Sequence, residues 1–339
     1  MPDREKRTIY DVASEAGVAI STVSRVLNDS AEVSEGTRLR VEAAIEKLQF
    51  RPQRTARILA QQETHSLAVV MPSFTSLFFV ELLKGVKDEL KEHDIDLLLC
   101  NLGSISPYQT LYRFLNRGAV DALLLCALPV DDQLERELVK LHAPVVLVGV
   151  ANSNFDSIYW DDEHGAELAT RHLAEIGHKR IGMITSHAWS YTTSSRIAGY
   201  RRALEAAGFP FESELVVAGD TTKHAGFSEE AGVEAMHKLM SLPNRPSAVF
   251  VSSDVKAFGA WCAARDLGLR VPEDVALVGY DNLKLSRFLG LTTIDQQMYN
   301  VGRSAARRLF HRMRSQIEDR VSNEILPPLI VRRSTMGAS

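Results

Sequence analysis

The sequence contains only three cysteines, Cys100, Cys126 and Cys262, and they lie far apart. A disulfide framework or a cysteine-rich metal site needs more cysteines at closer spacing, so we interpret these three as reduced thiols in the core. No apolar run reaches the roughly 20 residues of a membrane-spanning helix. The charged start of the chain also lacks the apolar stretch of a secretory signal. These absences predict a cytoplasmic protein without a metal site and without a membrane partner.

Motifs that identify common enzyme classes are missing as well. The chain has no GxGxxG fingerprint, no P-loop, no GxSxG elbow and no clustered metal-ligand spacing. We therefore expect no catalytic residue, no cofactor and no enzyme activity. Turnover of a sugar or nucleotide by the purified protein would revive the rival class, an enzyme.

The length and the charge distribution indicate several folding units with one basic region. A chain of 339 residues exceeds one ordinary core, so we expect two or three units. The net charge of −4 argues against nonspecific coating of nucleic acid, but one basic face suffices for DNA binding. Between residues 38 and 57, acids occur only at Glu42 and Glu46. Bases occur there at Arg38, Arg40, Lys47, Arg51, Arg54 and Arg57.

The first sixty residues have the apolar spacing of helices and no strand pattern. Thr8 with Asp11 forms a capping box that starts a helix near Ile9, and Gly17 ends it. A second helix follows Ala19 and Ile20 and ends near Asn28. Ser34 caps a third helix, which Pro52 stops, and residues 53–60 can form one further short helix. The apolar face expected for the third helix comprises Leu39, Val41, Ala44, Ile45 and Leu48.

Two helices joined by a tight turn with glycine are the layout of a DNA-binding helix-turn-helix. The second helix presents Ile20, Ser21, Ser24 and Arg25 away from its apolar face. An arginine fork matches the guanine edge in the major groove, and hydroxyls suit phosphates and base edges. Spacing alone also allows a three-helix adaptor whose polar face is merely solvated.

The same stretch resembles the head of the lactose-repressor (LacI/GalR-type) family of bacterial transcriptional regulators. The matching segments are TIYDVA at 8–13, GV at 17–18, TVSRVLN at 22–28, VS at 33–34 with TR at 37–38, FRP at 50–52 and ARILA at 56–60. The resemblance implies a sequence-specific regulator, most simply a repressor, that binds a palindromic operator in double-stranded DNA as a homodimer. Activation at some promoters remains an alternative.

The resemblance assigns roles to individual residues of the head. Ile20 and Ser21 match the positions that choose the operator, and Arg25 matches a frequent guanine contact. Residues 54–59 match a hinge helix that enters the minor groove, where Leu59 would wedge into a base step. Ala19 and Gln53 depart from the usual serine and asparagine. The expected DNA-binding residues are Thr8, Tyr10, Ile20, Ser21, Thr22, Ser24, Arg25, Asn28, Arg54, Ala56 and Leu59.

From residue 66 onward, apolar runs alternate with amphipathic stretches of helical length, which indicates parallel sheets covered on both faces. The runs expected to be strands are 67–71, 95–100, 122–126, 145–148, 181–185, 248–251 and 275–278. The stretches expected to be helices include 79–92, 165–176, 196–207 and 256–267. Seven or more strands over this length fit two doubly wound subdomains better than one.

This larger part also resembles the family, in its fold of the periplasmic-binding-protein type. The matching segments are FF at 78–79, DDEHG at 161–165, HL at 172–173, GHKRI at 177–181, RIAGY at 196–200, SD at 253–254 with Gly259, GYDN at 279–282 and LTTI at 291–294. The resemblance implies an α+α/β fold in three parts. The helix-turn-helix head covers 1–50, the hinge helix and linker 51–64, and the effector-binding domain 65–339. Within the last, an N-subdomain covers about 65–162 and 293–325, and a C-subdomain about 163–292 and 326–339.

The resemblance further implies a small-molecule effector, a carbohydrate or derivative, held by carboxylates, guanidinium and an aromatic face. Arg196 and Asp281 match positions that hydrogen-bond effector, although a structural ion pair is an alternative for both. Ser190 and Thr221 differ from the arginine and the aromatic of purine-binding relatives, so a purine or nucleoside is the second expectation. The expected effector-binding residues are Phe78, Phe79, Asp161, His164, Thr192, Arg196, Thr221, Ser253, Asp281 and Gln296.

Two further features bear on partners. The segment from 283 to 291 is two residues shorter than usual for the family and lacks its prolines, close to the expected ligand site. The tail after Arg332 has no leucine heptad, so a tetramer built by a coiled coil is not expected. A solute-binding protein of a transporter would share the larger fold, but the DNA-binding head and the missing export signal oppose that class.

Overall fold

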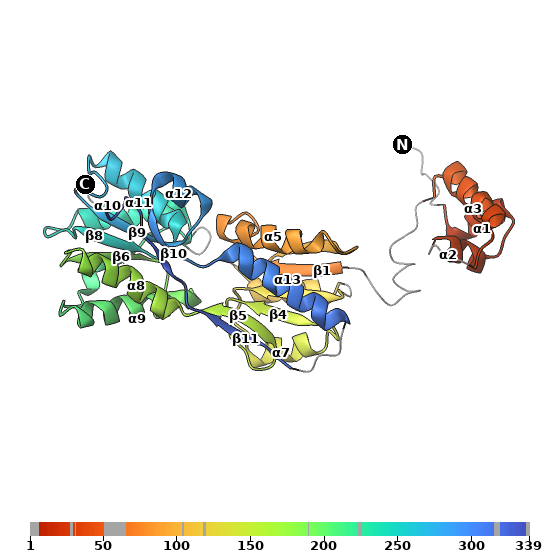
Figure 1. The fold of residues 1–339 in the computed structure, drawn as a ribbon, viewed down its shortest axis with the longest axis horizontal. Coiled ribbons are helices and arrows are strands. Elements are labelled where there is room, and N and C mark those ends of the chain that lie inside the picture. The colour runs from red at the N-terminus through yellow and green to blue at the C-terminus, as the bar shows by residue number, and fades with distance from the viewer. Residues whose placement is uncertain are drawn as a thin grey trace. The chain divides into compact units, whose positions relative to one another are not determined.

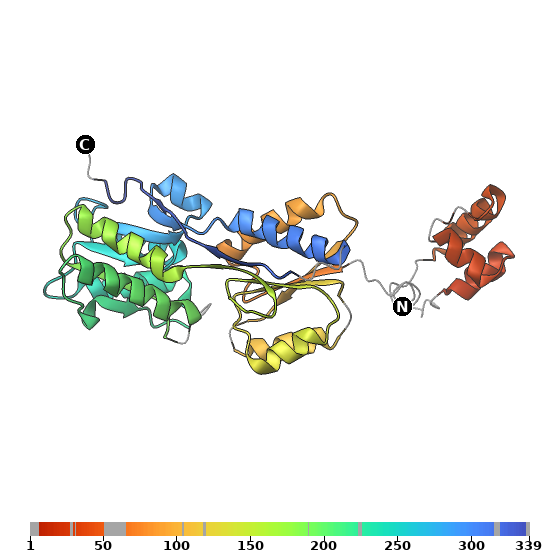
Figure 2. The ribbon, with the colours of Figure 1, turned by 60° about the horizontal axis from the view of Figure 1, so that its bottom comes forward.

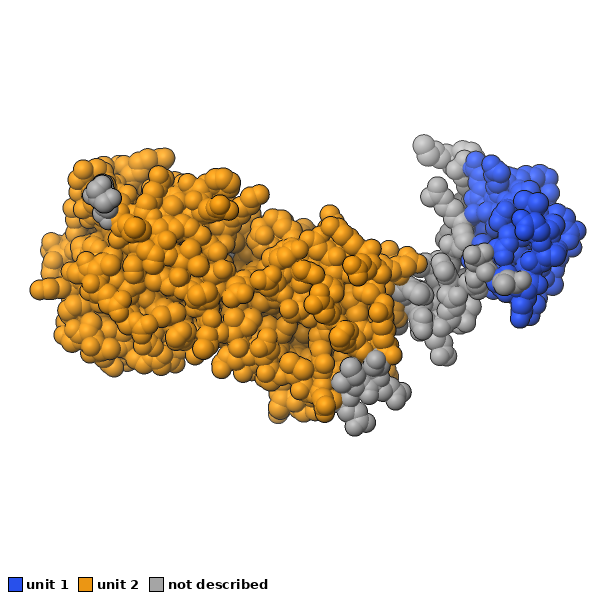
Figure 3. All heavy atoms as spheres, viewed as in Figure 1, with its two compact units in different colours: residues 1–64 blue, residues 65–339 orange. Residues whose placement is uncertain are grey.

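The computed structural model describes residues 7–27, 30, 32–50, 66–103, 105–117, 120–188, 190–222, 226–314 and 319–336. The chain divides into two compact units, residues 1–64 and residues 65–339, which Figure 3 colours separately. The predicted hinge helix and linker lie outside the described residues, so their fold stays a prediction. In the part of the chain that is described, no helix is long and apolar enough to cross a membrane.

The described residues of the smaller unit form three helices, as the sequence predicts for this stretch. They are α1 (Ile9–Ala16), α2 (Ile20–Leu27) and α3 (Glu35–Leu48). The backbone N–H and the hydroxyl of Thr8 donate to the Asp11 carboxylate at 2.7 and 2.9 Å, which caps α1. Gly17 ends this helix with a φ of 64°, a left-handed conformation that glycine adopts without steric cost. Helix α2 begins at Ile20, slightly earlier than expected.

The core of this unit corrects two details of the sequence prediction. Val12, Val23 and Val41, one from each helix, are fully buried and pack together. Leu39, expected on the apolar face of α3, is 58% exposed because that buried stripe runs through Val41 and Ala44 instead. Helix α3 ends at Leu48, before Pro52, because the backbone at Gln49 turns to a positive φ of 49°.

The larger unit contains two six-stranded sheets, and helices cover both faces of each (Figure 1). In the first sheet every pair of neighbouring strands is parallel, in the order β11-β5-β4-β3-β1-β2. Its strands are β1 (Ser66–Met71), β2 (Asp96–Asn101), β3 (Ala122–Cys126), β4 (Val145–Val148), β5 (Asp156–Trp160) and β11 (Ser322–Ile325). Its covering helices are α5 (Leu77–Leu90) and α13 (Met298–Arg314) on one face, and α6 (Pro107–Leu115) and α7 (Asp132–Val139) on the other.

The second sheet has the order β12-β10-β9-β8-β6-β7, and only its edge strand β12 runs antiparallel to its neighbour. Its strands are β6 (Ile181–Thr185), β7 (Val216–Ala218), β8 (Ala248–Val251), β9 (Ala276–Asp281), β10 (Thr292–Asp295) and β12 (Leu329–Ile330). Its helices are α8 (Asp162–Glu175) and α9 (Tyr191–Ala206) on one face, α10 (Glu229–Met240) and α11 (Asp254–Asp266) on the other, and the short α12 (Lys284–Leu289).

The chain passes three times between the two sheets. It leaves the first sheet after Trp160, returns after Asp295, and leaves again between β11 and β12. The return comes slightly later than the expected residue 293, because β10 pairs with β9 in the second sheet. Figure 2 shows the connecting segments between the two halves, and Figure 3 shows the larger unit waisted there. Two doubly wound halves joined at a waist confirm the predicted architecture.

All seven apolar runs expected to be strands are strands, and the described residues contain five further strands that the sequence did not predict. The missed strands β5, β10 and β11 mix polar with apolar residues, and β7 and β12 are three and two residues long. The interpretation of the cysteines also needs one correction. Cys100 and Cys126 are buried free thiols, but Cys262 is exposed on α11, because its side chain lies off the buried alanine stripe of that helix.

Glycines let the covering helices approach closely in pairs. A Cβ added at Gly85 of α5 would stand 2.0 Å from the backbone oxygen of Tyr299, and one at Gly302 of α13 would stand 2.1 Å from that of Leu82. Neither backbone oxygen can move away as a flexible side chain could. Gly85 and Gly302, each facing the backbone of the other helix, therefore allow α5 and α13 to pack closely.

We expect Gly85→Ala to lower the free energy of unfolding of the larger unit by at least 1–3 kcal/mol, roughly the cost of overpacking a core. All three tryptophans lie beyond residue 64, so urea unfolding followed by tryptophan fluorescence reports this unit. Gly36→Ala, in α3 of the smaller unit with open space around it, should leave that transition unchanged. An unfolding transition of Gly85→Ala at the same urea concentration as wild type would contradict the close approach of α5 and α13.

Candidate functional site

One surface of the smaller unit carries the residues that the sequence assigns to DNA. Helix α2 buries Val23 and Val26, so its opposite face presents Ile20, which is 41% exposed, together with exposed Ser21 and Arg25. Thr22 and Ser24 are half-buried beside them, and Thr8 and Tyr10 at the start of α1 are exposed. The expected positions Asn28, Arg54, Ala56 and Leu59 lie outside the described residues.

The guanidinium of Arg25 is free enough to change partners. Its Nε lies 3.7 Å from the Glu32 carboxylate, and the two side chains are 60% and 73% exposed. An exposed ion pair of this kind contributes little stability, so replacing Glu32 by a DNA base edge costs little. Ala19 precedes α2 and accepts the N–H of Thr22 through its backbone at 2.9 Å, without the hydroxyl that the family usually has there.

A second group of candidates lies where the chain passes between the two sheets. The indole N–H of Trp160 donates to the backbone oxygen of Gln296 at 2.9 Å, which joins two of the three passages. The Asp161 carboxylate accepts the backbone N–H of His164 at 2.8 Å and so caps α8. The side-chain oxygen of Gln296 is buried and has no hydrogen-bond partner among the described residues. A buried acceptor without a donor is costly, and a ligand can supply one.

Aromatic rings from the first half line the same region. Phe78 lies edge-on to Trp160 with ring centroids 6.1 Å apart, and edge-on to Phe79 at 5.0 Å. Phe79 is buried in the core of the first half, whereas Phe78 is only partly buried. Of the two expected rings, Phe78 is therefore the one that can offer a face to a ligand. On the other side of the waist, the Tyr191 hydroxyl of α9 donates to the backbone oxygen of Gly149 in the first half.

Arg196 occupies a buried ion pair. Its guanidinium donates to the Asp162 carboxylate at 2.8 and 2.9 Å and to the backbone oxygen of Ser252. It also stacks on the ring of Tyr280, 3.7 Å from the centroid, and the Tyr280 hydroxyl donates to Asp162 at 3.0 Å. Arg196 thus forms the structural ion pair that the sequence left open as an alternative. A role in effector binding would be additional to this ion pair.

Two neighbouring carboxyls lie beside this cluster, Asp254 at the start of α11 and Asp281 at the end of β9. Asp254 accepts hydrogen bonds from the Leu283 N–H at 2.8 Å and the Thr293 hydroxyl at 2.7 Å, and also from Ser286. Burial raises the pKa of Asp254 to about 6, although these donors oppose the shift. The Asp281 carboxylate accepts the N–H of Asp254 at 3.3 Å, and burial followed by the nearby Asp254 raises the pKa of Asp281 well above its usual range.

Lys256, which sequence reasoning missed, is fully buried near these carboxyls. Its ammonium donates to the hydroxyls of Ser186 and Ser252 and lies 4.5 Å from the ring centroid of Phe227. The signal for it is a lysine in the buried alanine stripe of α11. Trp160, Asp162, Tyr191 and Tyr280 were also missed as site residues. A tryptophan at the end of a strand and the acids that follow it were the signals available for the first two.

The structure gathers part of the expected ligand site and leaves the rest untested. Arg196, Ser253 and Asp281 share the carboxyl edge of the second sheet, where parallel sheets bind ligands. The Ser253 hydroxyl caps α11 by accepting the Lys256 N–H at 3.4 Å. The Thr221 backbone oxygen bonds to the ring of His187 at 2.8 Å. Roles for Thr192, Thr221 and His164 stay predictions.

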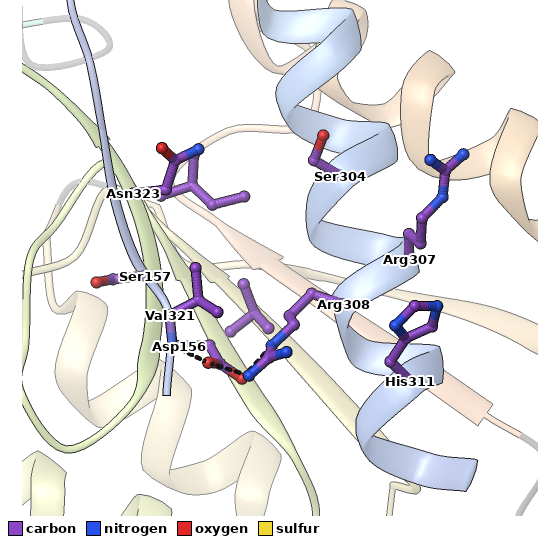
Figure 4. A pocket seen from close by; sticks show the side chains of 10 residues that line it. Asp156, Ser157, Ser304, Arg307, Arg308, His311, Val321 and Asn323 are labelled. Carbon is purple, nitrogen blue, oxygen red and sulfur yellow. Dashed lines mark hydrogen bonds and ion pairs between the residues drawn. The ribbon is translucent and has the colours of Figure 1, made fainter. Parts of the chain in front are cut away.

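A pocket on the first half of the larger unit lies apart from these residues. It has a volume of about 230 Å³ and lies between α13 and the strands β5 and β11 (Figure 4). Asp156 accepts hydrogen bonds there from Arg308, Arg312 and the Val321 N–H. Burial opposes ionisation of Asp156, but the bonds from Arg312 and Arg308 lower its pKa below the usual value. The pocket's charges therefore fasten α13 to the sheet edge.

The raised pKa of Asp254 predicts a pH dependence of stability. The pKa in the folded state, about 6, exceeds the ordinary 3.8. The contribution of the Asp254 carboxyl to the free energy of unfolding is therefore complete below pH 3.8 and is lost as pH rises through 6. We expect wild type to lose about 2 kcal/mol relative to Asp254→Asn between pH 4 and pH 7, since one pKa unit corresponds to about 1.4 kcal/mol and part of the loss has already occurred at pH 4. Urea unfolding of both proteins across this range measures the difference. Parallel stability curves would contradict the assignment.

Comparison with known families agrees with the two units. Residues 8–53 match the family described as bacterial regulatory proteins, lacI family. Residues 170–335 match the periplasmic binding protein-like domain. Each match falls in the unit that has the corresponding architecture.

Curated relatives and solved structures match almost the whole chain. The HTH-type transcriptional repressor PurR of Yersinia pestis is 37% identical over 334 residues, 96% of each chain. The transcriptional regulator CelR in complex with cellobiose is 33% identical, with a TM-score of 0.70 over 97% of this chain and 99% of its own. The Lac repressor dimer bound to operator and the anti-inducer ONPF is 26% identical, with a TM-score of 0.77 over 98% and 100%.

Proposed function

The chain belongs to the lacI family of bacterial regulatory proteins and is a DNA-binding transcriptional regulator rather than an enzyme, and from this premise we propose that it is a repressor. It would bind a palindromic operator in the cytoplasm as a homodimer. A small-molecule effector would control its affinity for that operator. The observation that carries the DNA-binding part is the exposed reading face of α2.

We propose that α2 enters the major groove with Ile20, Ser21 and Arg25 toward the base edges. The exposed fork of Arg25 can donate two hydrogen bonds to guanine, a contact worth roughly 1–3 kcal/mol of discrimination. Thr8, Tyr10, Thr22 and Ser24 would contact phosphates and fix the register without reading sequence. The CelR and PurR relatives are themselves regulators, which supports this use of the head.

We further propose that two copies of the chain bind together. The Lac repressor neighbour is a dimer bound to operator, and a two-fold dimer requires two half-sites about one helical turn apart. Arg54, Ala56 and Leu59, outside the described residues, would lie in the minor groove at the centre, with Leu59 as the wedge. An apolar wedge neutralises no phosphate, so it acts by bending the duplex.

For the effector we propose a carbohydrate or a derivative of one. A polyol would be suited by the half-buried ring of Phe78, by the side-chain oxygen of Gln296, which has no partner among the described residues, and by the carboxyl of Asp281. The CelR neighbour was solved with cellobiose. A purine base is the second candidate because the PurR relatives are 37% identical, although Ser190 and Thr221 depart from purine-binding members.

Effector control would act through the waist of the larger unit. A ligand that contacts both halves would favour one angle between them. That angle would set the spacing of the two hinge helices in the dimer, and only one spacing suits the minor groove. This is a shift between two pre-existing states, limited by the difference in the ligand's affinity for them.

Arg25→Ala should weaken operator binding by about 10- to 100-fold, because the bidentate guanine contact is lost. Arg25→Lys keeps the charge without the fork, so it should restore salt-dependent nonspecific binding but not operator preference. Selection from random DNA with wild type should return a palindrome, and with Arg25→Ala one position of each half-site should relax. Glu32→Gln is the control and should retain wild-type binding. An asymmetric site, or full preference in Arg25→Ala, would contradict the reading face.

Calorimetry with a panel of sugars and purine bases tests the effector. We expect a carbohydrate to bind, and Asp281→Ala and Gln296→Leu each to weaken it by at least 10-fold, because a polar group of the ligand is left without its partner. Asp266→Asn changes an exposed carboxylate on the same half and should bind as wild type does. Unchanged affinity in both site variants would refute the site. Binding of purine bases alone would refute the ligand class.

A further inference from the structure

The side-chain nitrogen of Lys256 lies at the carboxyl edge of the second sheet, where the effector is proposed to bind. Lys256 is in the first turn of α11, and its side chain reaches the ends of β6 and β8, where it bonds to Ser186 and, at 2.7 Å, to Ser252. These serines directly follow parallel strands, and ligands of such sheets bind beyond those carboxyl ends. The neighbouring strand β9 ends at Asp281 on the same edge.

No carboxylate in the described parts of the chain forms an ion pair with Lys256. Asp162 bonds to Arg196 and Tyr280. Asp254 accepts from the Leu283 N–H before α12 and from the Thr293 hydroxyl of β10. Asp281 favours the charged lysine from a distance, but burial, followed by repulsion from Arg196, lowers the pKa of Lys256 well below its usual value. The Lys256 amine is therefore held by hydroxyls and a ring, and an anion bound to it would favour its charged form.

Packing alone gives no reason for a lysine at this position. A methionine fills similar volume without a desolvation penalty, and replacing buried charge by apolar groups is often neutral or stabilising. Ser186 and Ser252 are likewise small hydroxyl residues at strand ends that need no cation for their backbone pairing. The cluster is better explained by a ligand than by the fold.

We propose that Lys256 selects an effector that carries an anionic oxyacid group, a carboxylate or phosphate on a carbohydrate. The anion would accept from the ammonium and from the Ser186 and Ser252 hydroxyls, as a charge-assisted and therefore strong set of hydrogen bonds. The ring of Phe227 covers one face of the ammonium at 4.5 Å, so the anion would replace that ring. This inference rests on the proposed effector function and narrows its ligand class.

The test compares matched neutral and acidic sugars by calorimetry on the full-length protein. The carboxylate arm pairs glucose with gluconate, galactose with galacturonate and cellobiose with cellobionate, and the phosphate arm pairs glucose with glucose 6-phosphate. We expect at least one acid to bind 10-fold or more tightly than its neutral partner. Lys256→Met should abolish that preference, and Lys238→Met, which removes an exposed lysine of the same half, should keep it.

A second variant protects the test against misfolding. Lys256→Gln retains a hydrogen-bond donor without charge, so it should also lose the preference if Lys256→Met does not fold. Preference for the acid that survives in either folded variant would overturn the inference. Tight binding of a neutral sugar but of no acid would overturn it while the proposed function stands. Binding of purine bases with no carbohydrate would overturn both.

Discussion

The hydrogen bond from the Trp160 indole to the backbone oxygen of Gln296 joins two of the three segments that link the halves of the larger unit. Because the strands of each half run parallel up to these segments, the carboxyl edge of each sheet faces the region where the chain passes over. Asp161 and Gln296 lie on the passages themselves, and Phe78 packs against Trp160. A ligand bound in this region would therefore contact the connecting segments and both halves at the same time. Under the proposed function, recognition and conformational control would depend on the same few residues.

The buried charged side chains of the second half differ in their partners, and packing does not require this difference. Arg196 is fully paired with Asp162 and rests on Tyr280, so removing one partner would leave an uncompensated buried charge. Lys256 has hydroxyls and a ring where Arg196 has a carboxylate. Asp254 and Asp281 hold raised pKa values next to each other. Among the described residues, the second half thus buries one arginine that is paired with a carboxylate and one lysine that is bonded to hydroxyls.

Much of the fold could be predicted because apolar runs and glycines act locally. The seven apolar runs became strands, and the capping box of Thr8 and the turn at Gly17 began and ended α1 as expected. The misses share a physical cause, since β5 and β11 are strands by their pairing and not by their own hydrophobicity. Arg196 and Asp281 could be named from the sequence, but the pairing of Arg196 with Asp162 depends on tertiary contacts 34 residues apart. Lys256 escaped because a single lysine in an amphipathic helix is usually solvated, and only the neighbours of α11 show it to be buried.

Coupling between the waist and the reading face is the central claim, and reciprocity tests it most directly. The affinity for operator should be measured with and without saturating effector, and the affinity for that effector with and without operator. The account predicts that both affinities change by the same factor, since the two ligands bias one equilibrium. Effector binding that is identical in the presence and absence of operator would contradict it.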